Sequence, residues 1–345
     1  MKWKKLFDPP TLEEVAQFER DLTPPAAQRA AHKDGSPQSA DALLRRLEWT
    51  TLKRLDGLLH GDFRTLMRGS GLDLADLREY QTHDDVRHID WNVTARMQTP
   101  YVRQFTEDRD INVWLLVDLS PSADFGSGAR NKRELAIELS TILARLFTQR
   151  GNRVGAMLYT RSVDTVLPPR ADRRHVLTLI QKMQRPPLHA VSHKGVNHGT
   201  NLAQLLSRAA QTIKRRSALI VVSDFISEPG WDDWLHRLSM RHDVLPVHID
   251  DPLERELPQV GLMTIEDPET GEQLFVDTGN AALRRRFAEM ASARELALKA
   301  SFERAGCDPL RLATNGSLID SLVRFVERRK LKRRGGIHSI QRRVA

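Results

Sequence analysis

The chain has 345 residues, which is enough for one large domain or two smaller ones. Apolar residues make up 40% and charged residues 28%, which excludes a disordered or collagen-like chain, and no apolar run is long enough to span a bilayer. A single cysteine, Cys307, excludes an internal disulfide and a cysteine-based metal site. The charged N-terminus has no apolar run behind it, so we expect no secretory signal and a cytoplasmic protein.

The net charge of +8 is concentrated at the C-terminal end. Residues 321–345 hold nine Lys or Arg and one acid, Glu327, so the rest of the chain is electrically balanced. Such a tail is either a solvated end without a partner, or it binds an acidic partner or an anionic membrane, which would place the protein peripherally at the inner membrane. The balanced body and the 6% aromatic content speak against nucleic acid as the partner.

Before residue 60 the sequence predicts helices joined by a linker. Thr11 and Glu14 have the spacing of a capping box for a helix over 11–23. Residues 24–40 have the composition of a linker, and leucines at helical spacing predict a second helix over about 40–59. We assign 1–59 to an N-terminal helical segment and 60–108 to a second segment before the main domain.

From residue 111 onward, predicted strands and helices alternate. Continuous apolar runs over 111–117, 218–222 and 244–249 are typical of strands buried on both faces. This alternation predicts an α/β fold over 109–320, a mostly parallel sheet with helices on both faces, followed by a basic tail over 321–345. The remaining predicted elements are helices over 132–150, 202–213, 281–304 and 317–331, and strands over 154–159, 163–167 and 310–312.

Hydroxyl and carboxylate side chains follow the ends of these strands. In an open α/β sheet, ligands bind beyond the carboxyl ends of the strands, where the strand order reverses. Each of these short polar motifs taken singly fits a turn or a helix N-cap, but their joint placement at the strand ends favours a single ligand-binding site. Their oxygens are hard ligands that suit Mg²⁺ or Mn²⁺. The residues expected to converge are Asp118, Ser120, Ser122, Thr200 and Asp224.

These five residues match, in order and context, the metal-ion-dependent adhesion site of von Willebrand factor A domains. The motifs GLDLADLREY at 71–80 and DDVRHIDW at 84–91 resemble the signature of DUF58, a bacterial family labelled a domain of unknown function, whose members carry such a domain. The resemblance covers roughly 50–330 and departs from the family at Ala123, where many members have methionine. It implies a Rossmann-like von Willebrand A fold, a divalent cation on the five residues, and a MoxR-type AAA+ ATPase as partner.

The segment 84–96 contains acidic residues and histidine, but it lacks the spacing of a known metal site. We expect a packed ion-pair and aromatic cluster that joins the segment to the main sheet, formed by Arg87, Asp90, Trp91 and Arg96.

The sequence lacks the motifs of the common hydrolases. It has no phosphate-binding loop, no zinc-protease motif and no nucleophile elbow, and Ser120 stands where haloacid-type phosphatases carry a second aspartate. We therefore expect a non-catalytic adaptor that binds a divalent cation, and the family resemblance implies that it assists a MoxR-like ATPase in assembly or maturation of a client protein. The alternatives are a metal-dependent phosphoryl hydrolase, or a binder of nucleic acid or anionic surfaces through the tail.

Overall fold

The structure, a computed structural model, describes residues 39–48, 76–81, 86, 89, 91–104, 112–185, 199–266 and 273–341, with side chains as far as residue 331. The helix predicted over 11–23 and most of the linker lie outside these residues. The helix predicted over 40–59 is described as α2, Ala40–Leu47. The domain boundaries stay a prediction.

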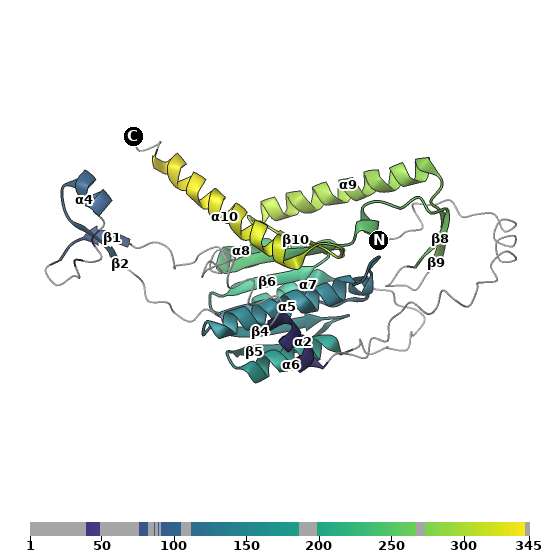
Figure 1. Cartoon of the computed structure of the whole chain (residues 1–345), viewed down its shortest axis with the longest axis horizontal. Helices are drawn as coiled ribbons and strands as arrows, with labels where there is room; N and C mark the ends of the chain where they lie inside the picture. The colour runs from purple at the N-terminus through teal and green to yellow at the C-terminus, as the bar shows by residue number, and fades with distance from the viewer. Residues whose placement is uncertain are drawn as a thin grey trace, which may run out of the picture.

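A six-stranded sheet in the order β10-β7-β6-β3-β4-β5 forms the centre of the molecule (Figure 1). Every neighbouring pair is parallel except β4 and β5, which are antiparallel and joined by a tight turn in which Thr160 N–H donates to the Ser162 carbonyl at 3.1 Å. The predicted mostly parallel sheet is therefore confirmed. Its strands are β3 (Asn112–Asp118), β4 (Arg153–Tyr159), β5 (Val163–Arg170), β6 (Ala218–Ser223), β7 (Asp243–Asp250) and β10 (Leu310–Ala313).

Helices cover both faces of this sheet, as the α/β prediction requires. One face packs against α2, α5 (Lys132–Gln149), α6 (Arg173–Gln184) and α10 (Leu318–Gln341). The other packs against α7 (Leu202–Thr212), α8 (Trp231–Arg241) and α9 (Ala281–Arg304). Successive strand side chains point to opposite faces, so Leu115 joins the first core and Leu116 the second. Both cores need apolar side chains, which explains the continuous apolar runs.

Among the described residues, two further two-stranded antiparallel sheets lie outside this sheet. β8 (Leu262–Glu266) pairs with β9 (Gln273–Asp277), and β1 (Asp76–Glu79) pairs with β2 (Tyr101–Gln104), with α4 (Trp91–Met97) before β2. Trp91 is 69% exposed, so the prediction that it packs in a cluster on the main sheet is wrong; Arg87 and Asp90 lie outside the described residues. The tryptophan belongs to a separate two-stranded sheet with its own helix, away from the apolar faces of the large sheet (Figure 1).

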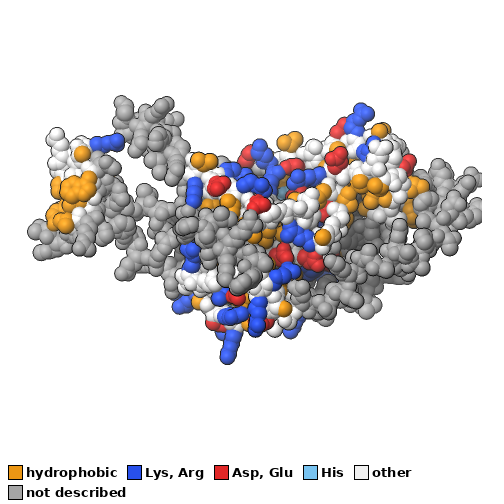
Figure 2. Space-filling view, viewed as in Figure 1, with side chains coloured by type: hydrophobic (Ala, Val, Ile, Leu, Met, Phe, Trp, Pro, Cys, Tyr) orange, Lys and Arg blue, Asp and Glu red, His pale blue; other side chains and the backbone are white. Residues whose placement is uncertain are grey.

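The C-terminal helix α10 runs past the predicted end at residue 331, to Gln341. Its first half is anchored in the core through four apolar side chains, and the Arg329 guanidinium lies 3.7 Å from the Asp308 carboxylate. Basic and acidic side chains intermingle on the body's face shown in Figure 2, in keeping with its balanced charge. Of the helices described, none is both long and apolar enough to cross a membrane. The anchoring side chains of α10 are Leu318, Leu322, Phe325 and Val326.

Candidate metal centre

The candidate site lies where the strand order reverses. From β3 the chain passes outward to β4 and β5, and it then returns to β6 on the other side of β3. Val117 and Val222 are partners in the β3–β6 register, so both strands end side by side. Asp118 ends β3 and Asp224 directly follows β6, which puts the two carboxylates at the same edge of the sheet.

Asp118 is a buried carboxylate whose hydrogen-bond donors in the described structure are uncharged. The Ser120 backbone N–H donates to Oδ1 at 3.0 Å, and the Ser223 hydroxyl donates to Oδ2 at 2.8 Å. Burial, together with the negative charge of Asp224, raises the pKa of Asp118 to about 6. In the described part of the chain no Lys, Arg or His forms an ion pair with Asp118, so its charge has no direct counter-ion.

The hydroxyls of Ser120 and Ser122 lie beside this carboxylate. A 3₁₀ helix over Pro121–Asp124 (η6) turns the chain directly after β3, with the Ala123 N–H donating to the Ser120 carbonyl at 2.9 Å. This turn brings the two buried hydroxyl oxygens within 3.1 Å of each other. Ser122 also donates a hydrogen bond to the carboxylate of Asp224. Two neutral oxygen donors therefore lie between the two aspartates.

Asp224 is fixed by the loop that follows β6. The Ile226 N–H donates to Oδ1 at 3.0 Å. Phe225 has a φ of 55°, in the left-handed region that bulky residues rarely adopt, and its buried ring packs against Trp231 and Phe302 with centroids 5.1 and 4.9 Å away. This aromatic packing holds the unusual backbone in place and with it the direction of Asp224.

Thr200 lies in the adjoining loop, just before α7. Its buried backbone is tied to the Asp224 loop, because its carbonyl accepts from the Glu228 N–H at 2.9 Å and from the Ser227 hydroxyl at 3.0 Å. The next residue, Asn201, caps α7 by accepting from Gln204 N–H at 3.2 Å. Side-chain contacts and burial thus bring together Asp118, Ser120, Ser122 and Asp224, and the backbone places Thr200 next to them.

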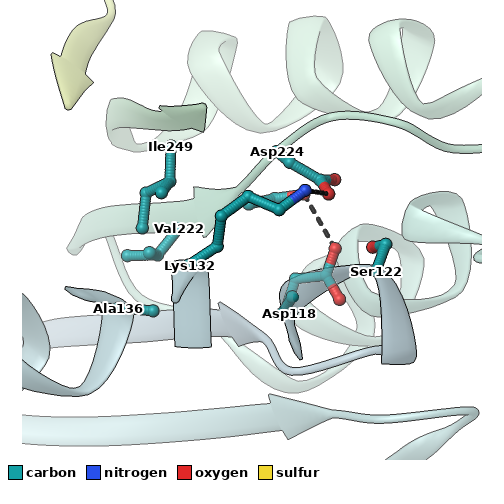
Figure 3. A pocket seen from close by; sticks show the side chains of 9 residues that line it. Asp118, Ser122, Lys132, Ala136, Val222, Asp224 and Ile249 are labelled. Atoms are coloured by element: carbon teal, nitrogen blue, oxygen red, sulfur yellow. Dashed lines mark hydrogen bonds and ion pairs between the residues drawn. The ribbon is translucent and has the colours of Figure 1, made fainter. Parts of the chain in front are cut away.

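Two charged residues that sequence reasoning missed complete the site. The Lys132 ammonium, at the first residue of α5, donates to Asp224 Oδ2 at 2.6 Å (Figure 3). It also donates to Glu254 Oε1 at 2.7 Å. Burial alone would lower the pKa of Lys132, but the two carboxylates outweigh it and raise the pKa above its ordinary value. In the sequence, Lys132 stands among charged residues at a helix start, a pattern typical of a solvated turn.

The residues present fit a divalent cation. A cavity of about 10 Å³, roughly the space of one water molecule, is lined by Asp118, Ser122, Lys132 and Asp224 among others. Three carboxylates against one ammonium leave the ionised cluster with two excess negative charges. No three His, Cys, Asp or Glu side chains of the described residues make a ligand set by themselves, so a metal would need the serine hydroxyls. Carboxylate and hydroxyl oxygens are what Mg²⁺ and Mn²⁺ prefer.

The doubly covered sheet, with hydroxyls and carboxylates at its switch point, defines an α/β protein of the von Willebrand A-like class. A family model described as Protein of unknown function DUF58 matches residues 76–297, and the chain belongs to this family.

The chain also resembles individual proteins. The uncharacterized protein Rv1480 of Mycobacterium tuberculosis is 35% identical over 291 residues, covering 84% of this chain and 89% of the relative. The uncharacterized protein MAV169 of Mycobacterium avium is 30% identical over 175 residues, or 50% of this chain and 97% of the relative.

Two of the solved structures that resemble the chain have TM-scores below 0.5. The conserved hypothetical protein BatB from Bacteroides thetaiotaomicron has a TM-score of 0.41 at 14% identity, over 64% of this chain and 98% of that chain. A von Willebrand factor type A protein from Catenulispora acidiphila has a TM-score of 0.31 at 17% identity, over 56% of this chain and 43% of that chain. Likeness at these scores carries no information about function.

Proposed function

We propose that this protein is a non-catalytic interaction protein that binds Mg²⁺ or Mn²⁺ at the edge of its sheet and, through the cation, a carboxylate of a partner protein. The observation that carries the proposal is Asp118, a buried carboxylate that has no direct counter-ion among the described residues and lies next to two facing serine hydroxyls. A buried charge is costly unless it is paired or coordinates a metal. A divalent cation would supply the missing charge.

The ligands would be Asp118, Ser120, Ser122 and Asp224, with Thr200 contributing from the adjoining loop. The hydroxyls add oxygen ligands without adding negative charge, so a bound cation would keep enough positive charge to attract one more carboxylate. A partner's Asp or Glu would meet this charge in a partly desolvated site, where the attraction exceeds its value in bulk water.

The partners we propose are a MoxR-like AAA+ ATPase and a client protein that it assembles or matures. This part of the proposal depends on the family resemblance alone.

The first prediction concerns the charge of Asp118. Asp118→Asn keeps the shape of the side chain but removes its charge, so it is expected to weaken Mn²⁺ binding at least tenfold, measured by titration calorimetry. Asp124→Asn is the matched control, because Asp124 follows in η6 but pairs with Arg133 outside the cavity. Equal affinity of the wild type and Asp118→Asn would contradict the metal site.

The same variant separates the adaptor from the alternatives. A complex bridged by metal is expected to dissociate in EDTA and with Asp118→Asn, and only to weaken in moderate salt, since salt screens exposed charge pairs. A complex that survives both treatments would place recognition elsewhere. Metal-dependent release of phosphate from a phosphoester, lost in Asp118→Asn, would favour the phosphoryl hydrolase instead.

A further inference from the structure

Lys132 already supplies a cation inside the candidate metal centre. Its side chain is 3% exposed, and its ammonium lies within hydrogen-bond distance of the carboxylates of Asp224 and Glu254, which belong to different elements. Figure 3 shows the ammonium next to Asp224. Asp224 follows β6, whereas Glu254 belongs to a 3₁₀ helix over Pro252–Glu254 (η7). The lysine thus bridges the end of β6 to the segment after β7.

The position of the ammonium is fixed from both sides. Asn131 caps α5 by accepting from the Glu134 N–H at 2.8 Å, and the Lys132 N–H donates to the Phe125 carbonyl at 3.0 Å. Glu254 accepts from the Asp251 N–H at 3.2 Å through Oε2, which leaves Oε1 for the lysine. These contacts make the bridge part of the packed structure, unlike an exposed ion pair.

The two partners of Lys132 have different relations to the cavity. Asp224 is one of the proposed metal ligands and lines the cavity together with Asp118 and Ser122, whereas Glu254 does not line it. An ammonium on Asp224 neutralises that carboxylate and repels any further cation placed between the aspartates. Glu254, at 2.7 Å, offers the ammonium a second partner that it can keep when it leaves Asp224.

We propose that Lys132 is a built-in competitor for the divalent cation. In the metal-free protein its ammonium holds Asp224, and metal binding requires Lys132 to give up Asp224 while keeping Glu254. The inference rests on the proposed function and deepens it, since it makes the site a two-state device with a stable metal-free form. The affinity for the metal is then set low by the chain itself, so that occupancy responds to the free cation concentration.

The competitor role can be distinguished from a supporting role of the same lysine. If Lys132 competes, its removal raises metal affinity, because a positive charge leaves the neighbourhood of the cation. If Lys132 serves to orient Asp224 as a ligand, its removal lowers affinity. The two roles therefore predict changes of opposite sign.

The experiment measures Mn²⁺ affinity by calorimetry and thermal stability with Mn²⁺ or EDTA. Lys132→Met is expected to bind Mn²⁺ at least tenfold more tightly than the wild type. In EDTA it is expected to melt at a lower temperature than the wild type, because two buried carboxylates lose their counter-ion, and Mn²⁺ should restore more of its stability. Lys214→Met, at an exposed lysine just after α7, makes the same charge change away from the site and is expected to match the wild type.

A second variant tests the competitor role independently, in case Lys132→Met does not fold. Glu254→Gln leaves Asp224 as the one anionic partner of Lys132 among the described residues, so Mn²⁺ affinity is expected to fall severalfold. Unchanged or weaker binding by a folded Lys132→Met, or unchanged or tighter binding by Glu254→Gln, overturns the competitor role while leaving the metal site standing. Absence of Mn²⁺ binding by both the wild type and Lys132→Met overturns the proposed function itself.

Discussion

Asp118 and Asp224 are both buried, but their charges are compensated differently. Burial alone would raise the pKa of Asp224, yet the Lys132 ammonium holds it below its usual value. The Asp118 carboxylate accepts hydrogen bonds from a backbone N–H and a hydroxyl, and its pKa is raised to about 6. This asymmetry is the physical reason to expect a cation next to Asp118.

His248 is a second titratable group that burial perturbs, and it lies on β7 outside the proposed ligand set. Its ring packs edge-on against Phe225, with centroids 6.2 Å apart, and its Nδ1 has no hydrogen-bond partner among the described residues. Burial, assisted by the positive charges of Arg311 and Arg255, lowers the pKa of His248 to about 4. The folded protein therefore keeps this imidazole neutral.

The second prediction follows from this pKa. The imidazole of His248 takes up a proton near pH 6.5 in the unfolded chain but only near pH 4 in the folded chain. The stability that comes from the neutral His248 is therefore fully present above about pH 6.5 and is lost as the pH falls from 6.5 to 4. Between pH 7 and pH 4.5 we expect the unfolding free energy of the wild type to fall by roughly 2–3 kcal/mol more than that of His248→Gln, measured by urea denaturation. His236→Gln, at an exposed histidine of α8, is the control. Parallel pH profiles of the wild type and His248→Gln would contradict the assignment.

At the scale of elements, the start of α5 connects the stability of a helix to the site. Asn131 closes a capping box with Glu134, and Lys132 is the next residue. A helix cap satisfies backbone N–H groups that have no partner within the helix. The cap therefore also fixes the stem from which the Lys132 ammonium reaches Asp224.

The third prediction tests this connection. Asn131→Ala is expected to cost about 1 kcal/mol of unfolding free energy and to change Mn²⁺ affinity. Asn280→Ala removes the equivalent cap of α9, where Asn280 accepts from Ala282 and Leu283 N–H groups at 3.0 and 3.3 Å, and is expected to cost a similar free energy with Mn²⁺ affinity unchanged. If both variants left the Mn²⁺ affinity unchanged, the cap would be purely structural.

The buried strands could be predicted from the sequence because both of their faces pack against helices. β3 and β6 have helices on both faces, so every position needs an apolar side chain and the runs stand out. The edge strand β5 alternates between half-buried and exposed positions, and the short helices α6 and α8 bury only a few residues each among polar ones. Polar and charged residues outnumber the apolar ones in both helices, so their apolar positions did not stand out as those of α7 do, and both helices were missed.

The residues of the candidate site likewise divide into those that the sequence pattern predicts and those that it does not. Asp118, Ser120 and Asp224 could be predicted because each follows a strand end that the apolar pattern marks. Lys132 could not, because its ion pairs join residues 92 and 122 positions apart in the sequence, and no local pattern encodes such contacts. Lys132 and Glu254 both belong to capping boxes or helix starts, which occur throughout proteins without a functional role.

At the scale of the whole molecule, charge is distributed unevenly along the chain. Residues 332–345 hold five Lys or Arg and no acid, whereas the residues before 321 are balanced. The first half of α10 is anchored through its apolar side chains and through Arg329 near Asp308. The helix therefore connects a packed body to a strongly basic end.

The last prediction concerns this basic end. Truncation after Leu331 lowers the net charge from +8 to +3 and keeps the buried side chains of α10, so the melting temperature is expected to stay unchanged. Binding to vesicles that contain phosphatidylserine, measured by co-sedimentation at low salt, is expected to weaken strongly, because each basic residue near an anionic surface contributes about 1 kcal/mol. Neutral phosphatidylcholine vesicles are the control, and they should bind neither form. Equal binding of both forms to anionic vesicles would show that the tail is not the attracting segment. A lowered melting temperature would instead show that residues beyond Leu331 stabilise the body.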